Sequence, residues 1–196
     1  MKFLLLPFLF ISSYCTSTTE SDSINQNNCE WCGANEAPKD ATWKTTIASP
    51  EERGERLHVS GTVLTAEGDP ATGVILYLYH TNAEGIYPKK GNEKGNGRRH
   101  GYLRGWIKTN QNGEYAFETI KPAAYPGRTE PAHIHLTIKE PNKEEYWLKS
   151  FLFAGDELLK AEDLKNNYTD DRFNHVLELT TENGILYGKR DIQLRK

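Results

Sequence analysis

A series of short apolar or alternating segments, separated by turn residues, is the feature of this sequence that most limits its fold. Several segments are bounded by Gly, Pro or Asn, and Asn110–Gly113 is typical of a hairpin turn. Only Glu157–Asn166 has leucines at helical spacing. The expected strands are Leu57–Thr65, Val74–His80, Tyr102–Lys108, Glu114–Glu118, His133–Ile138, Tyr146–Phe153, His175–Leu179 and Ile185–Leu194. This pattern predicts an all-β, Ig-like antiparallel β-sandwich with one short helix.

The length and composition are those of one globular domain with appendages. The chain has 196 residues, of which 37% are hydrophobic and 11% aromatic, enough for a sizeable core but not for a second catalytic domain. The formal net charge of −3 gives no reason to expect nucleic acid or a membrane surface as a partner. We expect residues 51–196 to form the β-sandwich domain and residues 16–50 to form a polar N-terminal arm.

Residues 1–15 have the composition of a secretory signal. Met1-Lys2 precedes an apolar run from Phe3 to Ile11, which is too short to span a bilayer but fits the core of such a signal. We therefore expect an exported protein, whether periplasmic, extracellular or lipid-anchored. Cys15 is then either a lipid attachment site after cleavage or lost with the signal.

Cys29 and Cys32 have a spacing shared by redox motifs and half zinc sites. A thioredoxin-like motif needs a βαβ context and a zinc site needs two further ligands nearby, and the sequence shows neither. In an oxidising compartment a local disulfide is the expected state of such a pair. It would staple the polar arm to the domain.

The sequence Ala132-His133-Ile134-His135 is the one place where the chain indicates a specific chemistry. Side chains alternate faces along a strand, so His133 and His135 project on the same side, roughly 7 Å apart. Two such imidazoles suit a metal ion. Taken alone, the pair also fits zinc, copper or two half-exposed histidines.

Four motifs in order carry a resemblance to a known family. They are Asn82–Tyr87 (Asn-Ala-x-Gly-x-Tyr), Gly113–Pro122, Tyr125-Pro126 and Ala132–His135. Through them the chain resembles the intradiol ring-cleaving dioxygenases, non-haem ferric enzymes that include catechol 1,2-dioxygenase and protocatechuate 3,4-dioxygenase.

The resemblance implies a set of ligands and a reaction. It implies that Tyr87, Tyr125, His133 and His135 bind Fe(III), and that Tyr125 also accepts a proton from the substrate. The implied substrates are a catechol-type aromatic diol and O2, and the implied product is a muconate-type diacid. Family members are often multimeric, which implies little for a chain this short, so a homo-oligomer and a monomer both stay open.

Such a donor set suits ferric iron on physical grounds. Ferric iron is a hard Lewis acid that lowers the pKa of groups bound to it, so a phenol would bind as phenolate. Two phenolates and one hydroxide would balance three positive charges, and the near-neutral site could lie in a pocket of low dielectric constant. The two neutral imidazoles would complete the set.

The chain departs from the family pattern in two places. The best-known members have an arginine three residues before the first histidine, where this chain has Glu130. Arg128 is the candidate replacement as a catalytic cation, and the alternative is that it is a solvated loop residue. Tyr79-His80 stands where a Trp-Gln pair is usual, which predicts a different pocket wall. The remaining histidines are expected to be structural or solvated, with His80 and His100 nearest to the site: His58, His80, His100 and His175.

A glycine-rich basic stretch, Lys89–His100, directly follows Tyr87. Such a run is usually a solvated loop. Because it follows a candidate ligand, it is alternatively a border of the pocket that attracts an anionic catechol.

Two functions from different classes remain open on the sequence. The first is an exported ferric intradiol dioxygenase. The second is a non-catalytic aromatic-binding or accessory β-sandwich of the same ancestry, favoured by the missing arginine and the altered pocket wall. A third, copper or zinc at the two histidines, is disfavoured because phenolate-rich ligation without thiolate suits a harder ion.

Overall fold

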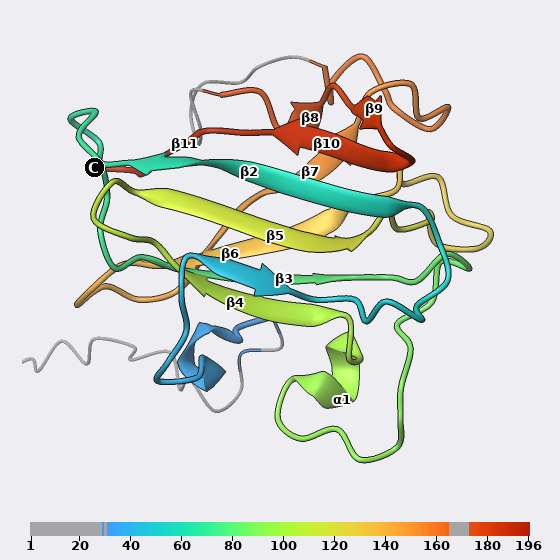
Figure 1. Cartoon of the computed structure of the whole chain (residues 1–196), viewed down its shortest axis with the longest axis horizontal. Helices are drawn as coiled ribbons and strands as arrows, with labels where there is room; N and C mark the ends of the chain where they lie inside the picture. The colour runs from blue at the N-terminus through green and yellow to red at the C-terminus, as the bar shows by residue number, and fades with distance from the viewer. Residues whose placement is uncertain (1–28, 30, 165–172) are drawn as a thin grey trace, which may run out of the picture.

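Two packed β-sheets make up the protein, for which a computed structural model describes residues 29, 31–164 and 173–196 (Figure 1). The first sheet has the order β1-β5-β2-β10-β9, and β11 also pairs with β2. Its strands are β1 (Lys44–Thr46), β2 (Arg56–Leu64), β5 (Glu114–Ile120), β9 (Thr180–Glu182), β10 (Ile185–Lys189) and β11 (Ile192–Gln193). The second sheet has the order β4-β3-β6-β7-β8. Its strands are β3 (Ile75–His80), β4 (Arg104–Lys108), β6 (Ile134–Lys139), β7 (Tyr146–Phe153) and β8 (Val176–Leu177).

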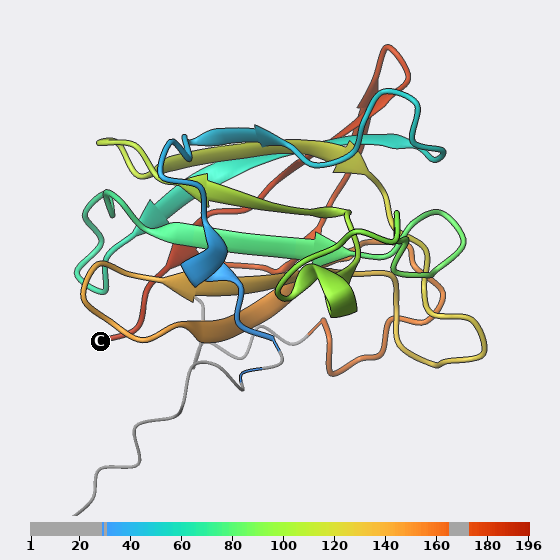
Figure 2. The same cartoon turned by 90° about the horizontal axis from the view of Figure 1, so that it is seen from below.

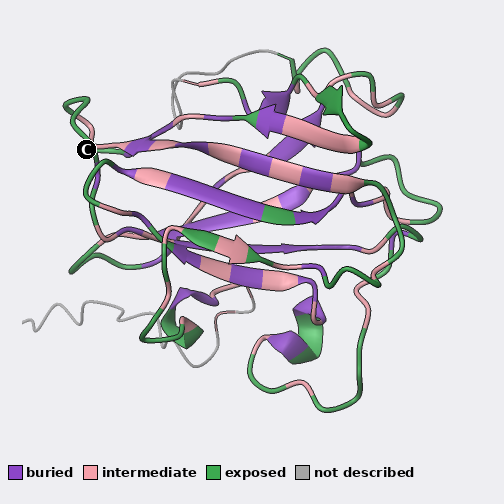
Figure 3. Cartoon of the chain, in the orientation of Figure 1, coloured by how far each residue is buried: buried purple, intermediate pink, exposed green. Residues whose placement is uncertain are grey.

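The core forms where the inward faces of the two sheets meet. Buried and half-buried residues alternate along β2, because successive side chains of a strand point to opposite faces (Figure 3). Leu57, Val59 and Val63 pack inward with residues of the second sheet such as Leu76 and Leu136. The sequence periodicity therefore sets which face of each strand enters the core.

The expected all-β sandwich is confirmed, although its sheets are mixed. Parallel pairs occur between β1 and β5, between β2 and both β10 and β11, and between β7 and β8. The strand expected over Ile185–Leu194 is divided into β10 and β11. At the break, Arg190 N–H donates to the Ser60 carbonyl at 3.0 Å, and Thr62 N–H donates to the Asp191 carboxylate at 2.9 Å.

The prediction of a helix over Glu157–Asn166 is wrong for residues 157–164, which form turns and irregular structure. Residues 165–166 lie outside the described residues. Acidic side chains bind backbone N–H groups of this segment in local turns. Leu158 N–H donates to Asp156 and Lys160 N–H donates to Asp163, each at 2.9 Å. Such local bonds favour turns over helix. The helices in the described residues are instead the 3-10 helix η2 (Ala34–Glu36) and the short α1 (Gly97–His100).

Part of the segment expected to be a polar arm belongs to the sandwich. Lys44–Thr46 forms β1 and pairs with β5. The strand was not expected because its residues are polar, but an edge strand with exposed and half-buried positions tolerates them. Residues 1–15, including Cys15, lie outside the described residues, and no helix among the described ones is long and apolar enough to cross a membrane.

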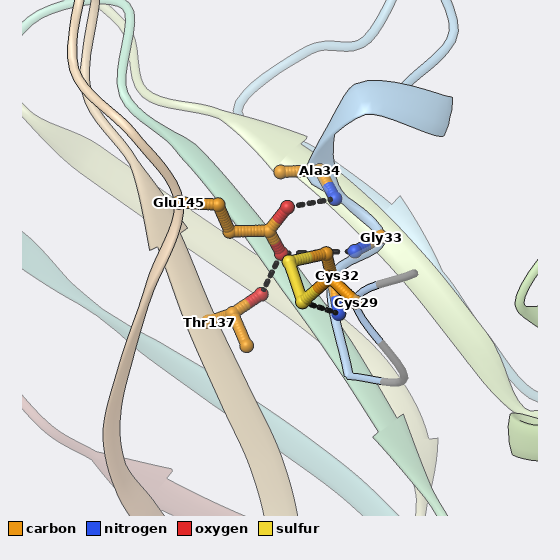
Figure 4. Close-up of a disulfide and its surroundings, with 6 residues drawn as sticks. All are labelled: Cys29, Cys32, Gly33, Ala34, Thr137 and Glu145. Atoms are coloured by element: carbon orange, nitrogen blue, oxygen red, sulfur yellow. Dashed lines mark hydrogen bonds between the residues drawn. A yellow bond between two sulfur atoms is a disulfide. The ribbon is translucent and has the colours of Figure 1, made fainter. Parts of the chain in front are cut away.

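The part of the arm around the disulfide and η2 lies on the outer face of the second sheet, as Figure 2 shows from below. Gly33 and Ala34 N–H groups donate to the two carboxylate oxygens of Glu145, at 2.9 and 3.0 Å (Figure 4). Thr137 in β6 donates its hydroxyl to the same carboxylate. A buried carboxylate satisfied by three donors fixes the arm on the sheet.

The local disulfide expected from the sequence joins Cys29 to Cys32. It closes the turn immediately before Gly33, beside the Glu145 carboxylate (Figure 4). Gly33 itself approaches β3 closely, because a Cβ atom there would lie 2.1 Å from a ring carbon of Tyr77. Only glycine fits at this position, because any side chain would collide with the Tyr77 ring on which the turn packs.

His80, at the end of β3, links the two sheets through its buried imidazole. Its Nδ1 lies 2.7 Å from the Thr81 carbonyl, and its Nε2 lies 2.7 Å from the Thr119 hydroxyl in β5. A neutral ring donates to the carbonyl and accepts from the hydroxyl. Burial lowers the pKa of His80 to about 4, although the bond to the Thr81 carbonyl opposes the shift.

The lowered pKa of His80 predicts an acid-sensitive fold. The unfolded chain takes up a proton near pH 6.5 while the folded protein resists until about pH 4, so stability falls as pH decreases through this window. The loss attributable to His80 is about 3 kcal/mol. Denaturant unfolding of the wild type and a His80→Gln variant across pH 4–7 measures it. The variant should show the shallower pH dependence, and parallel curves would contradict the prediction.

Candidate active site

The four candidate ligands predicted from the sequence converge on the outer side of the second sheet. His133 immediately precedes β6 and His135 is its second residue. Tyr87 lies in the connection after β3, and Tyr125 lies in the connection between β5 and β6. The two histidine Nε2 atoms are 3.0 Å apart, and the Tyr125 hydroxyl is 3.2 Å from Nε2 of His135. The Tyr87 hydroxyl contacts the Tyr125 hydroxyl. Two oxygen and two nitrogen donors thus surround one point.

Because side chains alternate between the two faces of β6, both imidazoles point away from the core. Ile134 and Leu136 are fully buried in the core, so His133 and His135 point to the opposite face. His133 Nδ1 lies 2.7 Å from the Pro131 carbonyl. Since only a protonated nitrogen donates to a carbonyl, Nε2 of His133 carries the lone pair that faces the other donors.

Asn82 ties together the two connections that carry the tyrosines. Its side-chain oxygen accepts N–H bonds from Glu84 and Ile86, closing the turn before Tyr87, at 3.1 and 2.9 Å. Its main-chain carbonyl accepts the Ala123 N–H, two residues before Tyr125, at 3.1 Å. The same residue therefore shapes one tyrosine connection and fastens it to the other.

Thr81 and Gly85 complete this junction. The Thr81 hydroxyl donates to the Ala123 carbonyl at 2.7 Å. Gly85 has φ of +75°, and a Cβ atom there would lie 2.0 Å from the Ala124 carbonyl oxygen. The close approach that brings Tyr87 and Tyr125 together requires glycine at this position.

Burial favours the neutral forms of Tyr87, Tyr125 and His135. It raises the pKa of Tyr87 well above the ordinary value, with a further rise from the hydrogen bond to Tyr125. It also raises the pKa of Tyr125, and the bond from Tyr87 opposes that rise. Burial, followed by the neighbouring His133, lowers the pKa of His135 to about 3. Neutral imidazole is the form that binds metals.

His135 lies in an aromatic slot. Tyr79 stacks on it with ring centroids 4.4 Å apart, and Trp147 of β7 lies edge-on at 5.3 Å. His100 of α1 stacks on the other face of Tyr79 at 3.7 Å and is held by the Tyr77 hydroxyl, 2.8 Å from its Nδ1. His100 thus borders the site as expected, whereas the His80 ring is directed away toward Thr119.

Trp147 is a site residue that the sequence analysis did not identify. It lies 12 residues after His135 on the neighbouring strand, and the pairing of Thr137 with Trp147 brings the two together. The sequence did contain a signal for Trp147, because strand alternation puts four aromatic residues on the outer face of the second sheet: Tyr77, Tyr79, Trp106 and Trp147. Following that alternation across β4, β3, β6 and β7 indicates an aromatic outer face.

The charged residues proposed for the site lie at its edge. Arg128 N–H donates to the Tyr125 carbonyl at 3.1 Å in a turn, and its side chain is exposed. The charge of Arg128 lowers the pKa of Tyr125, whereas the charge of Glu130 raises that of both Tyr125 and Tyr87. Within the basic stretch Lys89–His100, the lysines and arginines are exposed and His100 packs against the aromatic face.

The chemistry of the donor set fits a hard trivalent ion. Among the described residues, no group of three or more His, Cys, Asp or Glu could hold a metal ion. The converging donors are instead two phenols and two imidazoles, and phenolate oxygen is a ligand suited to hard cations. His133, its tautomer fixed by the Pro131 carbonyl, presents Nε2 toward that point, as metal-binding histidines do.

Known proteins share both the sequence pattern and the fold. A family model described as "Dioxygenase" matches residues 31–185. The protocatechuate 3,4-dioxygenase beta chain of Burkholderia cepacia is 31% identical, with 78% of this chain and 69% of that protein covered. Catechol 1,2-dioxygenase 1 of Acinetobacter lwoffii is 28% identical over 57% of this chain. The match spans only 40% of that relative's length.

Solved structures agree on the fold. The dioxygenase domain of a dioxygenase and carbohydrate-binding protein fusion from Streptomyces sp. SirexAA-E has a TM-score of 0.59 at 24% identity, with 80% of this chain and 90% of that chain covered. Catechol 1,2-dioxygenase from Acinetobacter sp. ADP1 has a TM-score of 0.59 at 19% identity, covering 80% of this chain and 58% of that chain. The family match over residues 31–185, together with these relatives, shows that the chain belongs to the intradiol ring-cleaving dioxygenases.

Proposed function

We propose that the protein is a non-haem Fe(III) intradiol dioxygenase that cleaves a catechol-type aromatic between its two hydroxylated carbons. The observation that carries the proposal is the convergence of Tyr87, Tyr125, His133 and His135 on one point. These four side chains would hold the ion. Ferric iron bound there would act as a Lewis acid that activates a chelated catechol toward O2.

The protein's own groups would bind and deprotonate the substrate. Tyr125 is less buried than Tyr87 and stands beside the Arg128 turn, so it is the phenol better placed to yield to the catechol. As phenolate, it would accept a catechol proton. The aromatic slot formed by Tyr79 and Trp147 would keep His135 from water. The ring opens with both atoms of one O2 retained in the product. One catechol and one O2 therefore account for all the atoms of a muconate-type diacid.

We also propose that the protein is exported. The apolar run Phe3–Ile11 supports a secretory signal, and the Cys29–Cys32 disulfide suits an oxidising compartment.

The first test combines iron, catechols and oxygen. Purified protein loaded with iron should show a broad visible charge-transfer band that shifts when catechol is added without oxygen. Admission of O2 should then give a ring-opened diacid. A His133→Ala/His135→Ala variant should lose the band and the product together. A colourless wild type without bound metal that still binds catechols would favour the non-catalytic aromatic-binding alternative.

The junction between the tyrosine connections makes a second prediction. Gly85→Ala should separate Tyr87 from Tyr125, because the new methyl group would collide with the Ala124 carbonyl. We expect at least a tenfold loss of iron affinity and on the order of 1–3 kcal/mol of stability. Gly91→Ala is the matched control, since Gly91 also has positive φ but nothing lies within 4 Å of its added Cβ. Equal iron affinity in the two variants would contradict the role of the junction.

A third prediction concerns the cation near Tyr125. If Arg128 stabilises negative charge on the reacting ring, Arg128→Gln should lower kcat by about tenfold, or about 1.4 kcal/mol. Arg98→Gln, an exposed change in the basic stretch, should leave kcat unchanged. Steady-state kinetics with one catechol measures both. Unaltered kcat in Arg128→Gln would assign Arg128 to the solvated loop.

A further inference from the structure

The N-terminal turn that precedes η2 reaches the aromatic slot around His135. Trp31, between the two disulfide cysteines, packs on Trp147 with ring centroids 5.5 Å apart. Trp147 in turn lies edge-on to His135 at 5.3 Å and is 6.2 Å from Tyr79. Trp31 therefore contacts the ring that lies against His135, a candidate ligand.

The turn is fastened to the sheet at Gly33, two residues after Trp31. The Trp106 indole of β4 donates to the Gly33 carbonyl at 2.6 Å. The Gly33 N–H donates to Glu145, which also accepts the Thr137 hydroxyl. Thr137 lies on the same face of β6 as His135, two residues further along. The turn is thus bonded directly to β4 through Trp106 and, through the Glu145 carboxylate, to β6, the strand that carries His135.

A second anchor joins η2 to the region of α1. Glu36 forms an ion pair with Arg104 at 2.6 Å and accepts the Asn96 N–H at 2.8 Å. Asn96 immediately precedes α1, whose His100 stacks on Tyr79. The arm is therefore linked to both aromatic rings that pack on His135, to Trp147 directly and to Tyr79 through α1.

From these contacts we infer that Trp31 is a positioning residue for His135, held in place by the Cys29–Cys32 disulfide and acting through Trp147. The inference deepens the proposed function, because it assigns control of one ligand to the arm. The disulfide restricts the turn on both sides of Trp31, and the packed rings restrict the imidazole. Loss of groups that orient a metal-binding histidine commonly lowers metal affinity by about 10- to 100-fold.

The first measurement uses metal-free protein and does not depend on iron or activity. Diethyl pyrocarbonate modifies accessible imidazoles, and mass spectrometry gives the rate for each histidine. Trp31→Ala should raise the rate at His135 at least fivefold, with half-exposed His58 as the internal reference. Trp31→Phe, which keeps an aromatic ring, should restore protection. Trp43→Ala is the matched control, because Trp43 contacts Lys44 and lies outside the aromatic slot.

The disulfide is tested in the same assay. Reduction of metal-free wild type with dithiothreitol should raise the rate at His135 as Trp31→Ala does. A Cys29→Ser/Cys32→Ser variant should show the raised rate with or without dithiothreitol. Both comparisons remain informative if Trp31→Ala does not fold.

Iron retention is the second measurement. Iron-loaded Trp31→Ala should release iron to a chelator about tenfold faster than Trp43→Ala. If the wild type binds no iron, the proposed function fails while the modification rates still test the role of Trp31. Equal His135 modification rates in wild type, Trp31→Ala and reduced protein would overturn the inference.

Discussion

Strand β6 divides its side chains between the hydrophobic core and the candidate active site, and the remaining structure depends on this division. Ile134 and Leu136 are held in the core, so His133 and His135 have no freedom to turn away from the outer face. A shift of the strand by one residue would exchange the two sets. The packing that stabilises the sandwich is therefore also what orients the imidazoles.

The tyrosines are positioned in a different way from the histidines. Tyr87 and Tyr125 lie on connections rather than strands, where periodic packing gives no orientation. Backbone hydrogen bonds through Asn82 and the close approach at Gly85 provide it instead. A rigid sheet thus presents two donors, and a pair of fastened connections presents the other two.

The sequence predicted most of the sandwich because short-range patterns determine it. The alternation of apolar residues placed β2, β3, β6 and β7 within one residue of their observed bounds. The same reasoning was wrong for Glu157–Leu164, where carboxylates of Asp156 and Asp163 bind backbone N–H groups that helical spacing does not reveal. It also missed β1, whose polar residues are held by pairing with β5 and not by burial.

For the site, the motifs indicated which side chains to examine, and the fold places those side chains together. Trp31 and Trp147 had no motif to mark them, since their proximity to His135 arises from the pairing of β6 with β7 and from docking of the arm. Residues whose role comes only from tertiary contacts cannot be recognised from local spacing. Glu145 is the clearest case, because its three donors come from Gly33, Ala34 and Thr137.

The placement of the arm also limits how copies of this chain can assemble. Trp31 and Gly33 lie over the aromatic outer face of the second sheet, in contact with Trp147 and Tyr77. A second subunit could stack its own sheet on that face only by displacing the arm and breaking its bonds to the buried Glu145 carboxylate. Association between subunits that leaves the arm in place must therefore use other surfaces.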